Sequence, residues 1–132
     1  MPLAFYVAYK SKFSYMNSKQ VMNHAADNIR ILAASMVEKA KSGHPGGAMG
    51  GADFINVLYA EYLQYDPQNP KWEGRDRFFL DPGHMSPMLY SQLALIGKFT
   101  LDELKQLRQW GSPTPGHPEV DVMRGIENTS GP

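Results

Sequence analysis

The sequence predicts an α/β fold of which these 132 residues form the first, mostly α-helical part, with one short strand. Helical periodicity and capping signals, separated by Gly- and Pro-rich breaks, predict helices over residues 24–41, 52–63, 87–97 and 101–110. One apolar run, residues 77–81, predicts a buried strand, and a single strand has no partner for its backbone groups. The chain is therefore either almost wholly helical or the opening piece of a larger α/β unit. The exposed strand edge favours the second interpretation.

The first two helices are predicted from apolar residues at intervals of three and four, which fall on one face of a helix. In the first helix these positions are Ile29, Leu32, Ala33, Met36, Val37 and Ala40, and in the second Ile55, Leu58, Tyr59, Tyr62 and Leu63. Gly43 follows the first helix, where glycine commonly provides the residue beyond the C-cap. The glycine-rich segment between the two helices reads as a turn.

The later helices are predicted mainly from their starts. Ser86 precedes Pro87, which suits a serine cap followed by proline at the first helical position. Thr100 and Glu103 have the spacing of a capping box. Residues 111–132 show no periodicity and contain many Gly and Pro residues, which predicts a long ordered loop of the kind that often carries function.

Composition limits the classes of function. Thirteen basic residues balance thirteen acidic ones without a run of like charge, so no nucleic-acid or anionic-membrane surface is indicated. No stretch reaches the length of a membrane span, and the absence of Cys excludes disulfides and thiolate metal sites. Residues 1–21 are predicted to be an N-terminal extension, with residues 1–15 an upstream or tag-like tail, and the folded part begins at residue 22.

Three of the four histidines, His44, His84 and His117, directly follow glycine, and two of these also precede proline. A residue before proline is held in extended conformations, so the direction of these imidazoles is restricted. Any one of them alone reads as a surface residue in a turn, and His24, without this context, keeps that interpretation. Together they suggest either a three-histidine zinc site, for which the usual short ligand spacing is missing, or a donor-rich pocket for a phosphorylated ligand with a histidine for proton transfer.

Four blocks, in this order, decide between these alternatives: "SGHPGGAMGGAD", "RDRFFLDPGHMSPMLYSQLALIG", "LRQWGSPTPGHPE" and "GIENTSGP". Together they resemble the N-terminal diphosphate-binding domain of transketolases, and the resemblance covers about residues 22–132. It implies a thiamine-diphosphate-binding fold and transfer of a two-carbon ketol unit from a ketose phosphate to an aldose phosphate. The implied cofactors are thiamine diphosphate and Mg²⁺.

The resemblance also implies roles for individual residues. His44 corresponds to the family's substrate-facing histidine, which takes part in proton transfer at the sugar hydroxyls. His84 corresponds to a histidine at the cofactor diphosphate, and His117 to one at the C1 hydroxyl of the donor sugar. Gly131 and the adjacent Pro132 fall in the block whose backbone approaches the cofactor.

The chain also departs from the family pattern. It lacks the family's Gly-Asp-Gly…Asn segment, which binds the metal, so no metal ligand is assigned here. It also lacks the family's separate pyrimidine-binding domain. We therefore expect the chain to be inactive alone, and to work as a homodimer or in a complex with the C-terminal remainder of the enzyme, in the cytoplasm, on sugar phosphates. Two alternatives stay open: a related thiamine-diphosphate synthase that condenses pyruvate with glyceraldehyde phosphate, and a non-catalytic helical interaction module.

Overall fold

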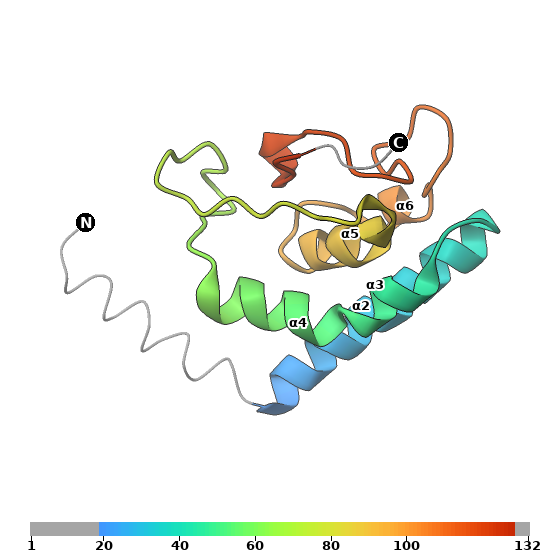
Figure 1. Ribbon diagram of the computed structural model, residues 1–132, viewed down its shortest axis with the longest axis horizontal. Helices are drawn as coiled ribbons and strands as arrows, with labels where there is room; N and C mark the ends of the chain where they lie inside the picture. The colour runs from blue at the N-terminus through green and yellow to red at the C-terminus, as the bar shows by residue number, and fades with distance from the viewer. Residues whose placement is uncertain (1–18, 129–132) are drawn as a thin grey trace.

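The computed structural model describes residues 19–128, which form a helical layer overlaid by a long irregular segment (Figure 1). The elements are α2 (Lys19–Ala40), α3 (Pro45–Gly50), α4 (Ala52–Val57), a π-helical turn (Leu58–Tyr62), a 3₁₀ turn (Gly83–Met85), α5 (Ser86–Leu95), α6 (Leu101–Leu104) and a second 3₁₀ turn (Val122–Arg124). No helix among the described residues is long and apolar enough to cross a membrane.

Helix α2 is the longest element and packs against α3, α4 and α5. Its buried face consists of Ala26, Ile29, Ala33 and Met36, as the periodicity predicts. The predicted start at His24 is wrong, because α2 begins at Lys19. The first turn is mostly exposed, so it adds no buried face to the apolar stripe from which the start was predicted. The side-chain amide of Asn56 donates a hydrogen bond to the carbonyl of Met22, in this turn, at 3.0 Å. Of the predicted extension 1–21, only residues 19–21 are described.

The glycine-rich segment after α2 forms the short helix α3, although its composition predicts a turn. Two of its glycines allow close packing against the methionines that flank the start of α5. A Cβ added at Gly47 would lie 3.0 Å from Cγ of Met85, and one at Gly51 would lie 2.5 Å from Sδ of Met88. These glycines therefore permit a tight helix contact. The second predicted helix, 52–63, is present as α4 and the π-helical turn that continues it.

The predicted strand 77–81 is wrong for the described part of the chain, in which no strand forms and the one isolated backbone bridge joins Asp121 to Ile126. A side chain takes the place of a partner strand. The amide of Asn128 accepts a hydrogen bond from the Leu80 N–H and donates one to the Leu80 carbonyl, both at 3.2 Å. Nearby, the guanidinium of Arg75 donates two hydrogen bonds, of 2.6 and 3.0 Å, to the carboxylate of Glu127. The backbone groups of Leu80 are thus paired without a sheet.

Helix α5 lies at the centre of the packed helices, with every residue from Ser86 to Leu93 buried. It starts one residue earlier than predicted, so Ser86 is inside the helix and its hydroxyl is used elsewhere. The capping box of Thr100 and Glu103 is confirmed at the start of α6. That helix ends at Leu104 rather than near residue 110, and turns follow as far as Arg108, whose backbone has φ of 62°.

Candidate functional site

Two of the three glycine-preceded histidines meet in the structure. The ring centroids of His44 and His84 lie 4.7 Å apart, with the rings tilted by 50°. His44 is the exposed N-cap of α3, and its φ of −124° and ψ of 98° confirm the extended backbone expected before Pro45. His84 is half-buried in the 3₁₀ turn that precedes α5. The tight contact of α3 with this turn brings the two rings together.

The loop that carries the third histidine is tied down by three successive carbonyls. The Thr114 carbonyl accepts a hydrogen bond from the backbone N–H of Arg108 at 3.0 Å. The Pro115 carbonyl accepts one from the hydroxyl of Tyr90 at 2.9 Å, and the Gly116 carbonyl accepts one from the hydroxyl of Ser86 at 2.7 Å.

Ser86 and Tyr90 are one turn apart on α5, so both hydroxyls point from the same face of the helix. Both residues are fully buried, and burial raises the pKa of Tyr90 well above its ordinary value of 10.0, with a smaller contribution from the charge of Glu119. The Tyr90 hydroxyl therefore stays a protonated donor at physiological pH. The half-buried His117 follows this tethered tripeptide directly and is anchored to the helix that begins two residues after His84.

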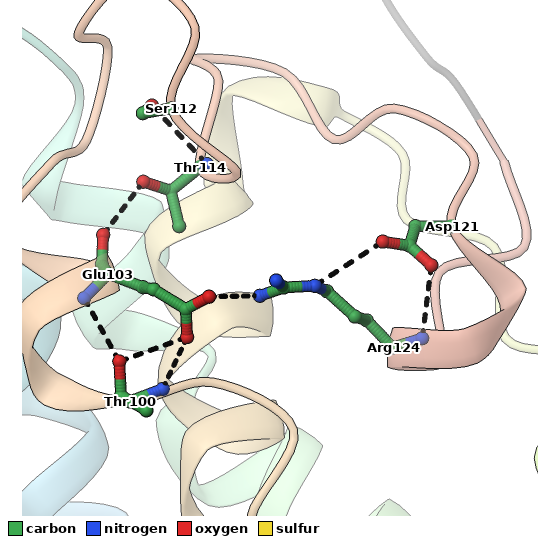
Figure 2. A network of polar contacts seen from close by, with 6 residues as sticks. All are labelled: Thr100, Glu103, Ser112, Thr114, Asp121 and Arg124. Atoms are coloured by element: carbon green, nitrogen blue, oxygen red, sulfur yellow. Dashed lines mark hydrogen bonds and ion pairs between the residues drawn. The ribbon is translucent and has the colours of Figure 1, made fainter.

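A polar network supports the base of the same loop (Figure 2). The hydroxyl of Thr114, which is fully buried, donates to the backbone carbonyl of Glu103 at 3.1 Å. The Glu103 carboxylate accepts hydrogen bonds from the N–H and the hydroxyl of Thr100, and forms an ion pair with Arg124 at 2.7 Å. Arg124 also contacts the carboxylate of Asp121 at 3.4 Å. The N–H of Thr100 contributes most to the lowered pKa of Glu103, so this carboxylate remains charged at neutral pH.

The sequence-predicted site residues are therefore distributed as follows. His44 and His84 are in contact. His117 lies on a loop that is hydrogen-bonded to α5, and His24 is exposed on α2. Gly131 and Pro132 lie outside the described residues. Sequence reasoning missed the supporting residues Ser86, Tyr90 and Arg108. Hydroxyl-bearing residues four apart on α5 were the available signal for the first two.

The described residues contain no group of three or more His, Cys, Asp or Glu side chains that could hold a metal ion. The three-histidine zinc alternative therefore gains no support from residues 19–128. The hydrogen-bond donors instead match part of a site for a phosphorylated ligand. The half-buried imidazole of His84 lies beside the N-terminal end of the glycine-rich segment. Nothing described here supplies the carboxylates that would bind a divalent cation at a diphosphate.

Comparison with known proteins identifies the family. Residues 21–132 match the family model described as transketolase, thiamine diphosphate binding domain. The chain belongs to the transketolase family. It is 52% identical over 108 residues to transketolase 1 of Escherichia coli (strain K12), which covers 81% of this chain and 16% of that protein.

Solved transketolases share the fold as well. Transketolase from Leishmania mexicana matches with a TM-score of 0.79 and 46% identity, over 84% of this chain and 17% of that one. Transketolase from Pichia stipitis in complex with sedoheptulose-7-phosphate matches with a TM-score of 0.79 and 43% identity, over 84% and 16%. The chain thus spans about one sixth of the length of the transketolases it matches. The α/β thiamine-diphosphate-binding fold of these transketolases is represented here by a mostly helical part.

Proposed function

We propose that this chain is the N-terminal part of an enzyme that transfers a two-carbon ketol unit from a ketose phosphate to an aldose phosphate with thiamine diphosphate. The observation that carries the proposal is the contact of His44 with His84 beside the tethered His117 loop, in a chain of the transketolase family. The solved Pichia stipitis complex with a sugar phosphate supports that class of substrate. Membership of the family favours the transferase over the pyruvate-condensing synthase.

The three histidines divide the work in this proposal. His84, which is half-buried, would donate a hydrogen bond to the cofactor diphosphate, together with backbone N–H groups around Gly131. His44, exposed beside it, exchanges a proton with a sugar hydroxyl, because a neutral imidazole carries one nitrogen that donates a proton and one that accepts it. His117 binds the C1 hydroxyl of the donor sugar. Thiamine diphosphate, when bound, supplies the nucleophilic carbon and accepts the electrons of the broken carbon–carbon bond.

The remaining parts of the site come from outside this chain. Mg²⁺ prefers oxygen ligands, and its carboxylate and carbonyl ligands, like the wall for the pyrimidine ring, belong to the rest of the enzyme. We further propose that the active form is a cytoplasmic homodimer, or a complex with the C-terminal remainder, acting in the pentose phosphate pathway. The isolated chain is inactive in this proposal because it holds half of the pocket.

A calorimetric titration of the isolated chain with thiamine diphosphate and Mg²⁺ tests the half-pocket proposal. We expect a dissociation constant weaker than about 1 mM, because donors without a metal site leave the charge of the diphosphate largely uncompensated. Saturable binding in the micromolar range would contradict the assignment and would reveal a metal site within these residues.

A hybrid enzyme tests the catalytic proposal. Residues 21–132 of this chain replace the matching segment of E. coli transketolase 1, to which they are about half identical. We expect ketol transfer between sugar phosphates and no condensation of pyruvate with glyceraldehyde phosphate. A hybrid that folds, binds the cofactor and transfers nothing would instead favour the non-catalytic interaction module.

Histidine variants of the hybrid separate the three roles. His44→Ala should lower turnover by about 10²–10⁴-fold, the effect of losing a positioned proton-transfer group, with little change in cofactor affinity. His84→Ala should weaken cofactor binding first. His24→Ala is the matched control, since that histidine is exposed on α2, away from the pair, and should leave both quantities unchanged. Equal loss of cofactor affinity in the first two variants would show that the roles are wrongly assigned.

A further inference from the structure

Arg108 has a backbone conformation that residues other than glycine seldom adopt. Its φ is 62°, in the left-handed region, where the Cβ crowds the following carbonyl. Among the described residues, Lys41 is the one other non-glycine with positive φ, and it directly follows α2. A strained conformation persists when surrounding contacts determine it, and such residues are common at functional sites. The contacts of Arg108 therefore need an explanation.

Those contacts join the two loops that carry His44 and His117. The backbone N–H of Arg108 donates to the Thr114 carbonyl at 3.0 Å, and its Nη1 donates to the hydroxyl of Ser42 at 2.7 Å. Ser42 lies two residues before His44, and Thr114 lies three residues before His117. Arg108 thus contacts the tethered tripeptide through its backbone and the segment that leads into α3 through its side chain.

The guanidinium also packs directly on Gly116. A Cβ added there would lie 2.8 Å from Nε of Arg108 and 3.3 Å from its Cζ and Nη2. Gly116 does not have a positive φ, so its backbone conformation does not call for glycine. A side chain at this position would meet the guanidinium of Arg108, which would have to move away. The guanidinium therefore lies against Gly116, the residue immediately before His117.

We propose that Arg108 is a positioning residue for the substrate: it sets the separation of the His44 and His117 loops by bridging Ser42 and Gly116. This inference rests on the proposed function, in which both histidines contact the bound sugar. A planar guanidinium can lie flat on a glycine while one of its nitrogens donates to a hydroxyl, which an ammonium group cannot do. Small displacements of positioned groups are costly in catalysis, so the bridge acts on the reaction without touching the substrate.

Two variants of the hybrid enzyme perturb the bridge from opposite sides. Arg108→Asn keeps a residue that tolerates the left-handed conformation but is too short to reach Ser42. Gly116→Ala keeps the arginine but displaces its guanidinium from residue 116. We expect each to lower kcat/KM for the ketose phosphate by about 10- to 100-fold, mainly through KM, while cofactor affinity changes by less than about twofold. Lys105→Asn, at the exposed ion pair with Asp102, is the matched control and should change neither.

The double variant distinguishes the bridge from simple damage to the loop. Gly116→Ala should add less than about a twofold loss in the Arg108→Asn background, because no guanidinium remains for the new methyl group to displace. Full additivity of the two losses, or a fall in cofactor affinity parallel to the fall in kcat/KM, would overturn the proposal. So would a kcat/KM that neither single variant changes.

Hydrogen exchange gives a readout that does not depend on the proposed function. In the same variants, amides of segments 42–47 and 114–118 should exchange faster than in the parent hybrid, and those of α2 should not. If the parent hybrid transfers no ketol unit, the proposed function fails, and the bridge is judged on exchange alone. Unchanged exchange in both segments of both variants would overturn it.

Discussion

The clearest structural prediction concerns the two hydroxyls that tie the His117 loop to α5. Tyr90→Phe removes the donor to the Pro115 carbonyl but keeps the ring and its contact with Phe99, whose centroid lies 5.4 Å away. Ser86→Ala removes the donor to the Gly116 carbonyl and leaves almost no cavity. Each variant therefore isolates one hydrogen bond, with little change in packing.

The expected cost follows from what is left behind. A typical hydrogen bond contributes about 1 kcal/mol net, and an acceptor left without a partner costs about 1–3 kcal/mol when it is fully buried. Pro115 and Gly116 are half-buried, so water can reach their carbonyls and the lower end of that range applies. We expect each variant to lower the free energy of unfolding by about 1 to 1.5 kcal/mol. The double variant should lose less than the sum, because both bonds hold the same tripeptide.

Urea unfolding of the chain followed by circular dichroism measures these losses, and hydrogen exchange of residues 114–117 shows whether the loop is released. Ser91→Ala is the matched control. It is fully buried on the same helix, but its hydroxyl donates to the carbonyl of Pro87 one turn back, at 2.7 Å, and makes no contact with the loop. That type of bond adds little to helix stability, so we expect a loss below about 0.5 kcal/mol. A loss in Tyr90→Phe no larger than in Ser91→Ala would refute the reasoning.

Three further predictions concern stability. Burial is the main cause that raises the pKa of Tyr59 and Tyr90 above 10.0, so these tyrosines ionise first in the unfolded state. The free energy of unfolding should therefore be unaffected below about pH 10 and fall as pH rises above it. Urea midpoints that stay constant up to pH 11 would contradict this. Asn128→Leu leaves both backbone groups of the buried Leu80 without their partner and should cost about 2 kcal/mol in urea unfolding. Asn128→Asp keeps the acceptor and should cost less. Equal costs for the two variants would count against the paired hydrogen bonds. Thr100→Ala removes the hydroxyl part of the capping box and should cost about 1 kcal/mol at pH 7 in urea unfolding. The N–H of Thr100 and the ion pair with Arg124 lower the pKa of Glu103, so stability from this carboxylate is present above its ordinary pKa and is lost as pH falls. A wild-type stability independent of pH between 7 and 3 would show that the carboxylate contributes nothing.

Local signals in the sequence were enough for the elements whose causes lie within about one turn of helix. The apolar stripe of α2, the capping box at Thr100 and the extended backbone of His44 each depend on residues no more than four positions away, and the structure contains all three. The ordered motifs around the histidines also identified the family, because residue types and intervals can be read without knowing what they contact.

Other features depended on partners far along the chain. The glycine-rich segment forms α3, and Met85 lies where a side chain at Gly47 would be. In the apolar run near residue 80, an amide 48 positions later pairs with both backbone groups of Leu80.

The supports of the candidate site are also long-range. Ser86 is a plausible helix cap by its neighbours, yet its hydroxyl binds a carbonyl 30 positions away, and Arg108 reaches a hydroxyl 66 positions back. The sequence by itself thus determined where α2, α4, α5 and α6 approximately lie, and the extended backbone of His44. Tertiary structure alone decided which polar groups meet, because a hydrogen bond depends on distance in space, and a chain compact enough to bury its apolar faces brings distant residues within that distance.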